Sequence, residues 1–433
     1  MRASRVYFVG IGGIGMSALA QLFKHRGKEV SGSDREASPT TELLAKKGIQ
    51  VWVGHDQCHI PADTELLIYS DAVPAENAER VRAREMKIPQ TSYFEALGEV
   101  SASMRTIAVS GTHGKTTTTG MLAKILQIAG KEPTAIVGSI VQDFGSNFLP
   151  GKGDLFVVEA CEYRDHLLEL SPEILVITNI ELDHTDFFPS LSALQHTFRA
   201  AVERVPEHGV IVANPSDPTV AAVLGGAKAP IIDYTTQTVP KTQLLGEFNA
   251  MNARAAKAAA RAAFPHVQEE YTDKALLNFK GSWRRFEHKG ETPDGALVYD
   301  DYAHHPTAVE KTIEAAKEKF SDKKIVVAFH PHLYSRTRDF MDGFAKALSR
   351  ADEVVLAPIY AAREEPIEGV TSEKLAEKIN VLGTPAQSFA SLAEVRDALL
   401  AISNKLQATG LLITMGAGDI YRVAEQITDG NNL

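Results

Sequence analysis

Two glycine-rich loops carry the residues whose chemistry is easiest to name. Each loop lies between an apolar run typical of a β-strand and a segment typical of a helix. Its backbone N–H groups are therefore expected at a helix N-terminus, where such groups bind phosphate. The first loop is Gly10-Ile11-Gly12-Gly13-Ile14-Gly15, and the second is Ser110-Gly111-Thr112-His113-Gly114-Lys115-Thr116-Thr117. Two such loops, a domain's length apart, predict a protein that holds two phosphorylated molecules at once.

The first loop fits the dinucleotide-binding pattern Gly10-x-Gly12-x-x-Gly15. Asp34 follows about 20 residues later, at the end of the next expected strand, where an acid contacts a ribose hydroxyl in such folds. Taken alone, the pattern indicates a dinucleotide cofactor. The alternative is a tight strand-to-helix turn, and the pattern does not identify the phosphate compound.

The second loop is a variant of the ATP-binding loop, because Val109 occupies the position of its usual first glycine. The mechanism survives, since backbone amides hold the β-phosphate, Lys115 reaches the β- and γ-phosphate oxygens, and Thr116 ligates Mg²⁺. The alternative is a threonine-rich helix start. We predict a nucleoside triphosphate with Mg²⁺, contacted by Gly111, Thr112, His113, Gly114, Lys115, Thr116 and Thr117.

Candidate metal ligands follow two further strands. Glu159 ends a buried strand, and its carboxylate suits Mg²⁺, which prefers oxygen ligands. His184 follows another strand end, close to the expected γ-phosphate. A structural role for His184 and a ligand role both stay open, and the neighbouring Glu162 is either a ligand or exposed to solvent.

Acids, histidines and arginines cluster after two strands of the last third of the chain. Asp300-Asp301-Tyr302-Ala303-His304-His305-Pro306 suits a metal, or contacts to a ribose and a substrate, and the alternative is a polar turn before a helix. In the second cluster, 330–338, His332 and Arg336 are suited to hold a carboxylate, the arginine bidentately.

An alternation of strands and helices must position these groups. Apolar runs predict strands at 6–9, 29–34, 65–69, 106–109, 155–159, 174–179, 210–214, 296–301, 324–329, 353–358 and 411–415. Helices are predicted at 16–25, around 75–86, and at 116–129, 249–263, 307–319, 340–347 and 372–379. The order predicts three α/β domains: a Rossmann-like domain at 1–103, a central P-loop ATPase domain at 104–283 and a Rossmann-like C-terminal domain at 284–433.

Composition narrows the classes of function. A net charge of −10 without a basic block argues against nucleic-acid and anionic-membrane partners. The two cysteines and the missing signal-peptide pattern indicate a reducing cytoplasm, and no apolar run approaches the roughly 20 residues that span a bilayer.

Together the motifs resemble those of the Mur ligase family, and within it the ligases that add the first amino acid, L-alanine. They occur in the family's order and cover nearly the whole chain. Besides the two loops they are Ser31-Gly32-Ser33-Asp34, Asp301-Tyr302-Ala303-His304-His305-Pro306-Thr307, Ser335-Arg336-Thr337-Arg338, Ile359-Tyr360-Ala361-Ala362-Arg363-Glu364 and Thr414-Met415-Gly416-Ala417-Gly418-Asp419. The chain departs from the family pattern at Phe248, at Cys161 and Tyr163, and at Leu333.

The resemblance implies an ATP- and Mg²⁺-dependent ligase of cytoplasmic peptidoglycan synthesis, and so a part in cell shape and division. It would join L-alanine to UDP-N-acetylmuramate through an acyl phosphate, as a monomer or a dimer. Substrate would be bound by Gly12, Gly13, Ile14, Gly15, Asp34, Ser70, His332, Tyr334 and Arg336, with the first loop on the diphosphate of the UDP sugar. His304, His332, Tyr334 and Arg336 would lie near the substrate carboxylate and the incoming alanine. ATP would also be contacted by Asn249, Asn252 and Asp301; the metal would be held by Thr116, Glu159 and His184; and catalysis would involve Lys115, His304 and Arg336.

Three other functions stay open at this point. One is a recycling ligase that joins a tripeptide to the same UDP sugar, although the first loop resembles the alanine enzymes. Another is a dehydrogenase with an added ATPase domain, which would bind a nicotinamide. The third is a nucleotide-gated interaction protein without catalysis, against which the acid and histidine clusters argue.

Overall fold

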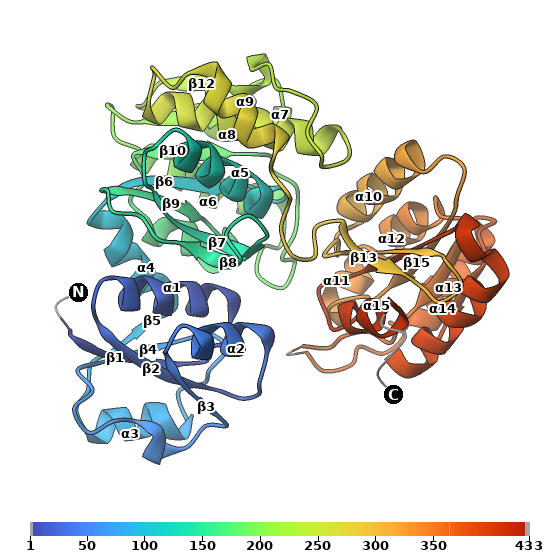
Figure 1. The fold of residues 1–433 in the computed structure, drawn as a ribbon, viewed down its shortest axis with the longest axis horizontal. Helices are drawn as coiled ribbons and strands as arrows, with labels where there is room; N and C mark the ends of the chain where they lie inside the picture. Colours follow the sequence, from blue (N-terminus) through green and yellow to red (C-terminus); the bar gives the residue numbers. More distant parts are fainter. Residues whose placement is uncertain (1–2, 363, 429–433) are drawn as a thin grey trace. The chain divides into compact units, whose positions relative to one another are not determined.

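A computed structural model describes residues 3–362 and 364–428, which form two compact units. The first unit comprises 3–181, 191–243 and 250–280, and it holds two sheets. The second comprises 182–190, 244–249 and 281–428 and holds the third sheet. Each sheet is flanked by helices (Figure 1). The prediction of three α/β domains is confirmed. No helix in the described part of the chain is both long and apolar enough to cross a membrane.

The first sheet is entirely parallel, in the order β3-β2-β1-β4-β5. Its strands are β1 (Arg5–Val9), β2 (Glu29–Asp34), β3 (Gln50–Val53), β4 (Leu66–Tyr69) and β5 (Gln90–Ser92). Its helices are α1 (Ile14–His25), α2 (Pro39–Lys46), α3 (Ala78–Glu85) and α4 (Tyr93–Ala102). The strand order reverses between β1 and β4, and ligands of open α/β sheets bind at such a point.

The second sheet has the order β12-β11-β10-β6-β9-β7-β8 and is parallel except for the β7–β8 hairpin. Its strands are β6 (Arg105–Ser110), β7 (Thr134–Val141), β8 (Ser146–Leu149), β9 (Leu155–Glu159), β10 (Ile174–Ile177), β11 (Val210–Ala213) and β12 (Ile231–Asp233). The helices that follow in this part of the chain are α5 (Lys115–Ile128), α6 (Leu191–Arg204), α7 (Pro218–Leu224), α8 (Glu247–Ala263) and α9 (Glu269–Leu277). Helix α1 of the first sheet packs against the β7–β8 hairpin (Figure 1).

The third sheet has the order β13-β14-β18-β15-β16-β17, with only the β13–β14 pair antiparallel. Its strands are β13 (Glu287–Glu291), β14 (Leu297–Asp301), β15 (Lys324–Phe329), β16 (Glu353–Leu356), β17 (Ala386–Ser388) and β18 (Gly410–Met415). Its helices are α10 (Pro306–Lys319), α11 (Tyr334–Asp339), α12 (Met341–Leu348), α13 (Ser372–Val381), α14 (Leu392–Leu406) and α15 (Tyr421–Thr428).

The third sheet has a hydrophobic core on each face. Along β15, Ile325 and Val327 belong to one core, whereas Val326 and Ala328 belong to the other. Because successive side chains of a strand point to opposite faces, a strand buried on both faces must be apolar throughout. This explains why the continuous apolar runs of the sequence are its central strands, with the polar residues confined to their ends.

Candidate active site

The first glycine-rich loop lies at the carboxyl ends of β1, β2 and β4. Gly10 has φ +82°, a backbone conformation that favours glycine, and Cβ of Ser70, directly after β4, lies 3.0 Å from where a Cβ on Gly10 would be. Asp34 ends β2, and its Oδ2 accepts a hydrogen bond of 2.7 Å from the N–H of Gly12. The structure thus brings Asp34 and Ser70 to the loop, and it uses one oxygen of Asp34 to shape the loop.

Helix α1 starts inside this loop without a capping side chain. Gly13 is its N-cap residue, and Ile14 and Gly15 are its first two helical residues. The first N–H groups of a helix have no acceptor within the helix, so this end can accept an anion. The ring of Tyr93, from α4, packs on Gly15, so closely that a Cβ there would lie 2.6 Å from the phenol oxygen.

The second loop connects β6 to α5 and requires glycine at two positions. Gly111 and Gly114 have φ values of +127° and +83°. Neighbouring groups fix the loop between them, because the N–H of His113 donates to Asn179 Oδ1 at 2.9 Å and the Thr112 hydroxyl donates to the carbonyl of Glu181 at 2.8 Å. The side chain of Asn252, on α8, lies against Gly114.

Lys115 is held by a buried carboxylate. Its Nζ lies 3.0 Å from Oε1 and 2.9 Å from Oε2 of Glu162, whose side chain is only 1% exposed, so the alternative of a solvent-exposed Glu162 is wrong. Burial is the largest single influence and would lower the pKa of Lys115, but the charge and hydrogen bond of Glu162, together with the charge of Glu159 and the nearby Cys161, outweigh burial and raise the pKa. Lys115 is therefore a fixed positive charge at the start of α5.

The carboxylate of Glu159 accepts hydrogen bonds from helix α5 and from strand β7. Its Oε1 accepts a hydrogen bond of 3.1 Å from the Thr116 hydroxyl, and its Oε2 accepts one of 2.8 Å from the N–H of Gly138 on β7. Two oxygen atoms that can ligate a metal, the Thr116 hydroxyl and a Glu159 carboxylate oxygen, thus lie together beside the second loop. This donor set fits Mg²⁺, which is bound through one or two carboxylates with phosphate oxygens and waters.

In the second unit, Arg336 forms a buried ion pair with Asp183. Nε and Nη2 of Arg336 donate to Asp183 Oδ1 at 3.0 and 2.7 Å, and the side chains are 5% and 7% exposed. Burial would raise the pKa of Asp183, but the guanidinium of Arg336 and the nearby histidines hold this pKa well below its usual range. Arg336 Nη1 also lies 3.2 Å from His332 Nδ1.

His304 lies in the same cluster. Its ring centroid is 6.3 Å from that of His332, and its Nδ1 lies 2.8 Å from the carbonyl oxygen of Tyr302. Burial, assisted by the charge of Arg336, lowers the pKa of His304 well below its usual range. His304 is therefore neutral at physiological pH, and a neutral imidazole can accept a proton.

Asp301 ends β14 and is also buried. Its carboxylate accepts hydrogen bonds of 2.7 Å from the N–H groups of Phe286 and Ala303. Burial raises the pKa of Asp301 to about 6, against the opposing charge of Arg285. The structure thus places Asp301 at a strand end, as the sequence predicts.

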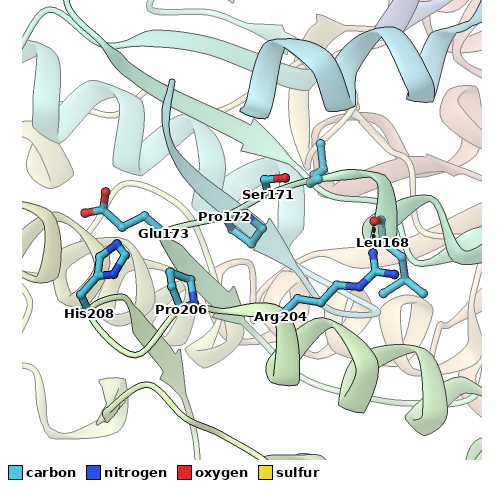
Figure 2. Close-up of a pocket in the computed structure, with 8 residues that line it drawn as sticks. Leu168, Ser171, Pro172, Glu173, Arg204, Pro206 and His208 are labelled. Atoms are coloured by element: carbon cyan, nitrogen blue, oxygen red, sulfur yellow. Dashed lines mark hydrogen bonds between the residues drawn. The ribbon is translucent and has the colours of Figure 1, made fainter. Parts of the chain in front are cut away.

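A pocket of about 490 Å³ lies elsewhere in the first unit (Figure 2). It is lined by Leu168, Leu170, Ser171, Pro172, Glu173, Arg204, Pro206 and His208. Glu173 immediately precedes β10, whereas the second loop follows the other end of β6, the strand that pairs with β10 in parallel. This pocket therefore lies at the opposite end of the sheet from the phosphate-binding loop.

Comparison with known proteins identifies the family. Three family models match in chain order: the catalytic domain of the Mur ligase family at 5–105, the Mur ligase middle domain at 109–241, and the glutamate ligase domain of Mur ligases at 284–418. A UDP-N-acetylmuramate–L-alanine ligase of Caldicellulosiruptor saccharolyticus is 37% identical over 98% of both chains. Another, of Salinibacter ruber, is 38% identical over 99% of this chain and 95% of its own. The chain belongs to the Mur ligase family.

Solved structures agree with this membership. A UDP-N-acetylmuramate–alanine ligase of Thermotoga maritima matches this Mur ligase with a TM-score of 0.81 and 28% identity, over 98% of each chain. A murein peptide ligase of Psychrobacter arcticus matches with a TM-score of 0.74 and 25% identity, over 99% of each chain.

The residues that the sequence nominates fall into three groups in this Mur ligase. Gly12, Gly13, Ile14, Gly15, Asp34 and Ser70 surround the first loop, and Lys115, Thr116, Glu159 and Asn252 surround the second. The second unit holds His184, Asn249, Asp301, His304, His332, Tyr334 and Arg336. The predicted metal ligands are therefore divided: Thr116 and Glu159 are in contact, and His184 belongs to the other unit.

Two groups in the site lacked a specific signal in the sequence: Asp183 and Gly138. Asp183 precedes the nominated His184, but its pairing with Arg336 depends on the fold. Glu162, which the sequence analysis names as either a ligand or an exposed residue, instead pairs with Lys115. Of the departures from the family pattern, Leu333 is buried at φ +70° before α11, and burial raises the pKa of the Cys161 thiol to about 12. Arg363 of the fourth motif lies outside the described residues.

Proposed function

We propose that this Mur ligase joins L-alanine to UDP-N-acetylmuramate at the expense of ATP, in the synthesis of peptidoglycan precursors. The observation that carries the proposal is the end-to-end similarity, at 35–38% identity, to many ligases of that name. The two phosphate-binding loops of the first unit support it, because the reaction needs two nucleotide-linked molecules. The cytoplasm is the proposed location.

We assign the domains as 1–103 for the UDP substrate, 104–283 for ATP and 284–433 for the amino acid and closure on the nucleotide. In the first domain, the amides of Ile14 and Gly15 would bind the diphosphate of the UDP substrate, because they start α1 without a capping side chain. Gly12 and Gly13 would let the backbone approach that diphosphate closely, with the N–H of Gly13 donating to the Gly10 carbonyl at 3.2 Å. The free oxygen of Asp34 and the hydroxyl of Ser70 would bind further parts of that substrate.

In the second domain, Gly111, Thr112, His113, Gly114 and Thr117 would surround the ATP phosphates. Lys115 would contact the β- and γ-phosphate oxygens, since Glu162 keeps its amine charged. Thr116 and Glu159 would hold Mg²⁺ with His184, and Asn249, Asn252 and Asp301 would contact the adenosine. When bound, Mg²⁺ supplies positive charge that stabilises the transferring phosphoryl group.

The reaction proceeds in two balanced steps. The lactyl carboxylate attacks the γ-phosphorus of ATP, the bond to the bridging oxygen breaks, and ADP leaves with an acyl phosphate formed. The amine of L-alanine then attacks the acyl carbon, loses a proton, and inorganic phosphate leaves the tetrahedral intermediate. Lys115 stabilises the charge of the first step.

The third domain would bind the amino acid. Arg336, oriented by Asp183, and His332 present positive or donor groups suited to a carboxylate, and Tyr334 begins the same helix as Arg336. His304 is neutral and would accept the proton that the amine loses, since its pKa lies well below its usual range.

Phosphate release from ATP tests the proposal. The assay contains UDP-N-acetylmuramate and, in separate reactions, L-alanine, glycine, L-serine, a tripeptide or no amine. We expect release that depends on L-alanine and on Mg²⁺. Release only with the tripeptide would identify a recycling ligase, and release without any amine would refute a ligase altogether.

A further inference from the structure

A buried polar cluster joins the substrate loop of the first domain to the hairpin of the second. Its four side chains, Ser17 and Gln21 on α1 and Ser146 and Asn147 on β8, are between 0 and 3% exposed. Gln21 Nε2 donates to Asn147 Oδ1 at 2.9 Å, and the Ser146 hydroxyl donates to Gln21 Oε1 at 2.9 Å. All of these residues belong to the first unit.

Asn147 reaches the loop itself. Its Nδ2 donates to the carbonyl oxygen of Ile14 and, at 2.8 Å, to the hydroxyl of Ser17. That hydroxyl also donates to the Ile14 carbonyl, at 3.0 Å. The peptide between Ile14 and Gly15 is therefore held by a side chain from a different domain.

This peptide is one of those proposed to meet the diphosphate. A trans peptide is planar, and its C=O and N–H point in opposite directions. Fixing the Ile14 carbonyl therefore fixes the direction of the Gly15 N–H, which is among the helix-start amides without an acceptor in the helix.

The other end of the connection is the proposed ATP site. Asn147 is on β8, which pairs with β7 at Ile136↔Phe148 and Val141↔Ser146. Between these pairs, the N–H of Gly138 on β7 donates to Glu159, and Glu159 accepts from Thr116. One hairpin thus contacts the substrate loop on one side and the metal carboxylate on the other.

We propose that Asn147 is a positioning residue for the reaction, which orients the Gly15 amide of the substrate loop relative to the ATP site. The inference rests on the proposed function for the identity of the substrate. If the cluster only buried the contact between α1 and β8, Asn147 would not need to donate a hydrogen bond to the carbonyl of Ile14. Fully satisfied buried polar groups fix one geometry, whereas apolar side chains would bury the same area without fixing it.

The test compares Asn147→Ala with Gln21→Leu, which disrupts the same buried cluster but leaves the bonds from Asn147 to Ile14 and Ser17 in place. Both variants should unfold at a lower temperature than the wild type. For Asn147→Ala we expect the Kd for UDP-N-acetylmuramate, measured by calorimetry, to rise about tenfold. The KM for the same substrate should rise by a similar factor. The KM for ATP should stay within about twofold. Gln21→Leu should leave the Kd within about twofold of the wild type.

An unchanged Kd for Asn147→Ala, or equal increases in both variants, would overturn the proposal. If Asn147→Ala fails to fold, Asn147→Ser decides, because its hydroxyl is too short to reach Ile14 and leaves a smaller cavity. Calorimetry needs no turnover, so a wild type that binds the UDP sugar but ignores L-alanine would refute the proposed function and still test Asn147.

Discussion

Gly138→Ala should impair the proposed metal site by displacing the carboxylate of Glu159. Gly138 is on β7, and its N–H donates a hydrogen bond of 2.8 Å to Glu159. A Cβ on Gly138 would lie 2.7 Å from both Cδ and Oε1 of Glu159. Oε2 of Glu159 would lie closer still. Because ordinary contact begins at 3.4 Å, the carboxylate must move by at least about 0.7 Å or rotate away.

The size of this movement sets the expected loss. Mg²⁺ demands near-ideal octahedral geometry with oxygens at about 2.0–2.1 Å, so its ligand cannot drift by a third of that distance and remain bound. A misplacement of about 1 Å in an active site costs on the order of 100-fold. We therefore expect kcat/KM for ATP to fall roughly 10- to 100-fold, or about 1.4–2.7 kcal/mol, with a higher Mg²⁺ requirement.

The assay is phosphate release in the presence of L-alanine, with Mg²⁺ varied at saturating substrates. The matched control is Gly225→Ala at the end of α7, where no atom lies within 4 Å of the added Cβ and the backbone is right-handed helical. The control should retain wild-type kinetics. An unchanged Mg²⁺ dependence in Gly138→Ala would refute the assignment of Glu159, and an equal loss in the control would refute the steric argument.

Three further outcomes are expected. Asp183→Asn should lower the unfolding free energy, measured by urea titration, by about 3–5 kcal/mol, because it leaves a buried guanidinium without its charge partner. The control Asp339→Asn, in the more exposed pair with Arg338, should lower it by at most about 1 kcal/mol. Equal losses in the two variants would contradict this reasoning. The folded-state pKa of Asp301, raised to about 6, exceeds its unfolded value, so its contribution to stability is full below about pH 4 and is lost as pH rises through 6. Between about pH 4 and pH 6, the unfolding free energy of the wild type, derived from thermal melts, should fall by up to roughly 3 kcal/mol relative to that of Asp301→Asn. A difference between the two proteins that stays constant with pH would refute the raised pKa of Asp301. Gly15→Ala should raise the KM for the UDP substrate at least tenfold by displacing the Tyr93 ring or the helix start, and a normal KM would show that the ring yields freely.

The sequence predicted best what depends on local pattern. The bounds of β9 were predicted to the residue, because a strand buried on both faces is a continuous apolar run. The bounds of α10 were predicted to within one residue, because His305-Pro306 marks the start of the helix in the sequence. The loops were located for the same reason, since glycine at Gly111 and Gly114 is required by the left-handed backbone and not by any distant partner.

What the sequence did not predict depends on partners distant in the chain. The β7–β8 hairpin was not predicted, because Gly138 and Ser139 interrupt the apolar residues of β7 and β8 has only four residues, two of them polar. The pairing of Arg336 with Asp183 spans 153 residues, and only the fold shows that these two charges are buried together. Contacts of this kind decide pKa values, which is why the charge of Lys115 and the neutrality of His304 were not evident from the sequence.

The β7–β8 hairpin contacts both proposed nucleotide sites of the first unit, that for ATP and that for the UDP substrate. The strand that carries Gly138 fixes the carboxylate proposed for the metal, and the strand that carries Asn147 fixes a peptide of the substrate loop. Because β7 and β8 pair, the hairpin holds these two contacts in one relative geometry, and a change at either contact alters how the bound substrate lies relative to ATP. The effects of Gly138→Ala and Asn147→Ala on kcat should therefore not be additive when combined, since both perturb the hairpin that connects the proposed metal carboxylate to the substrate loop.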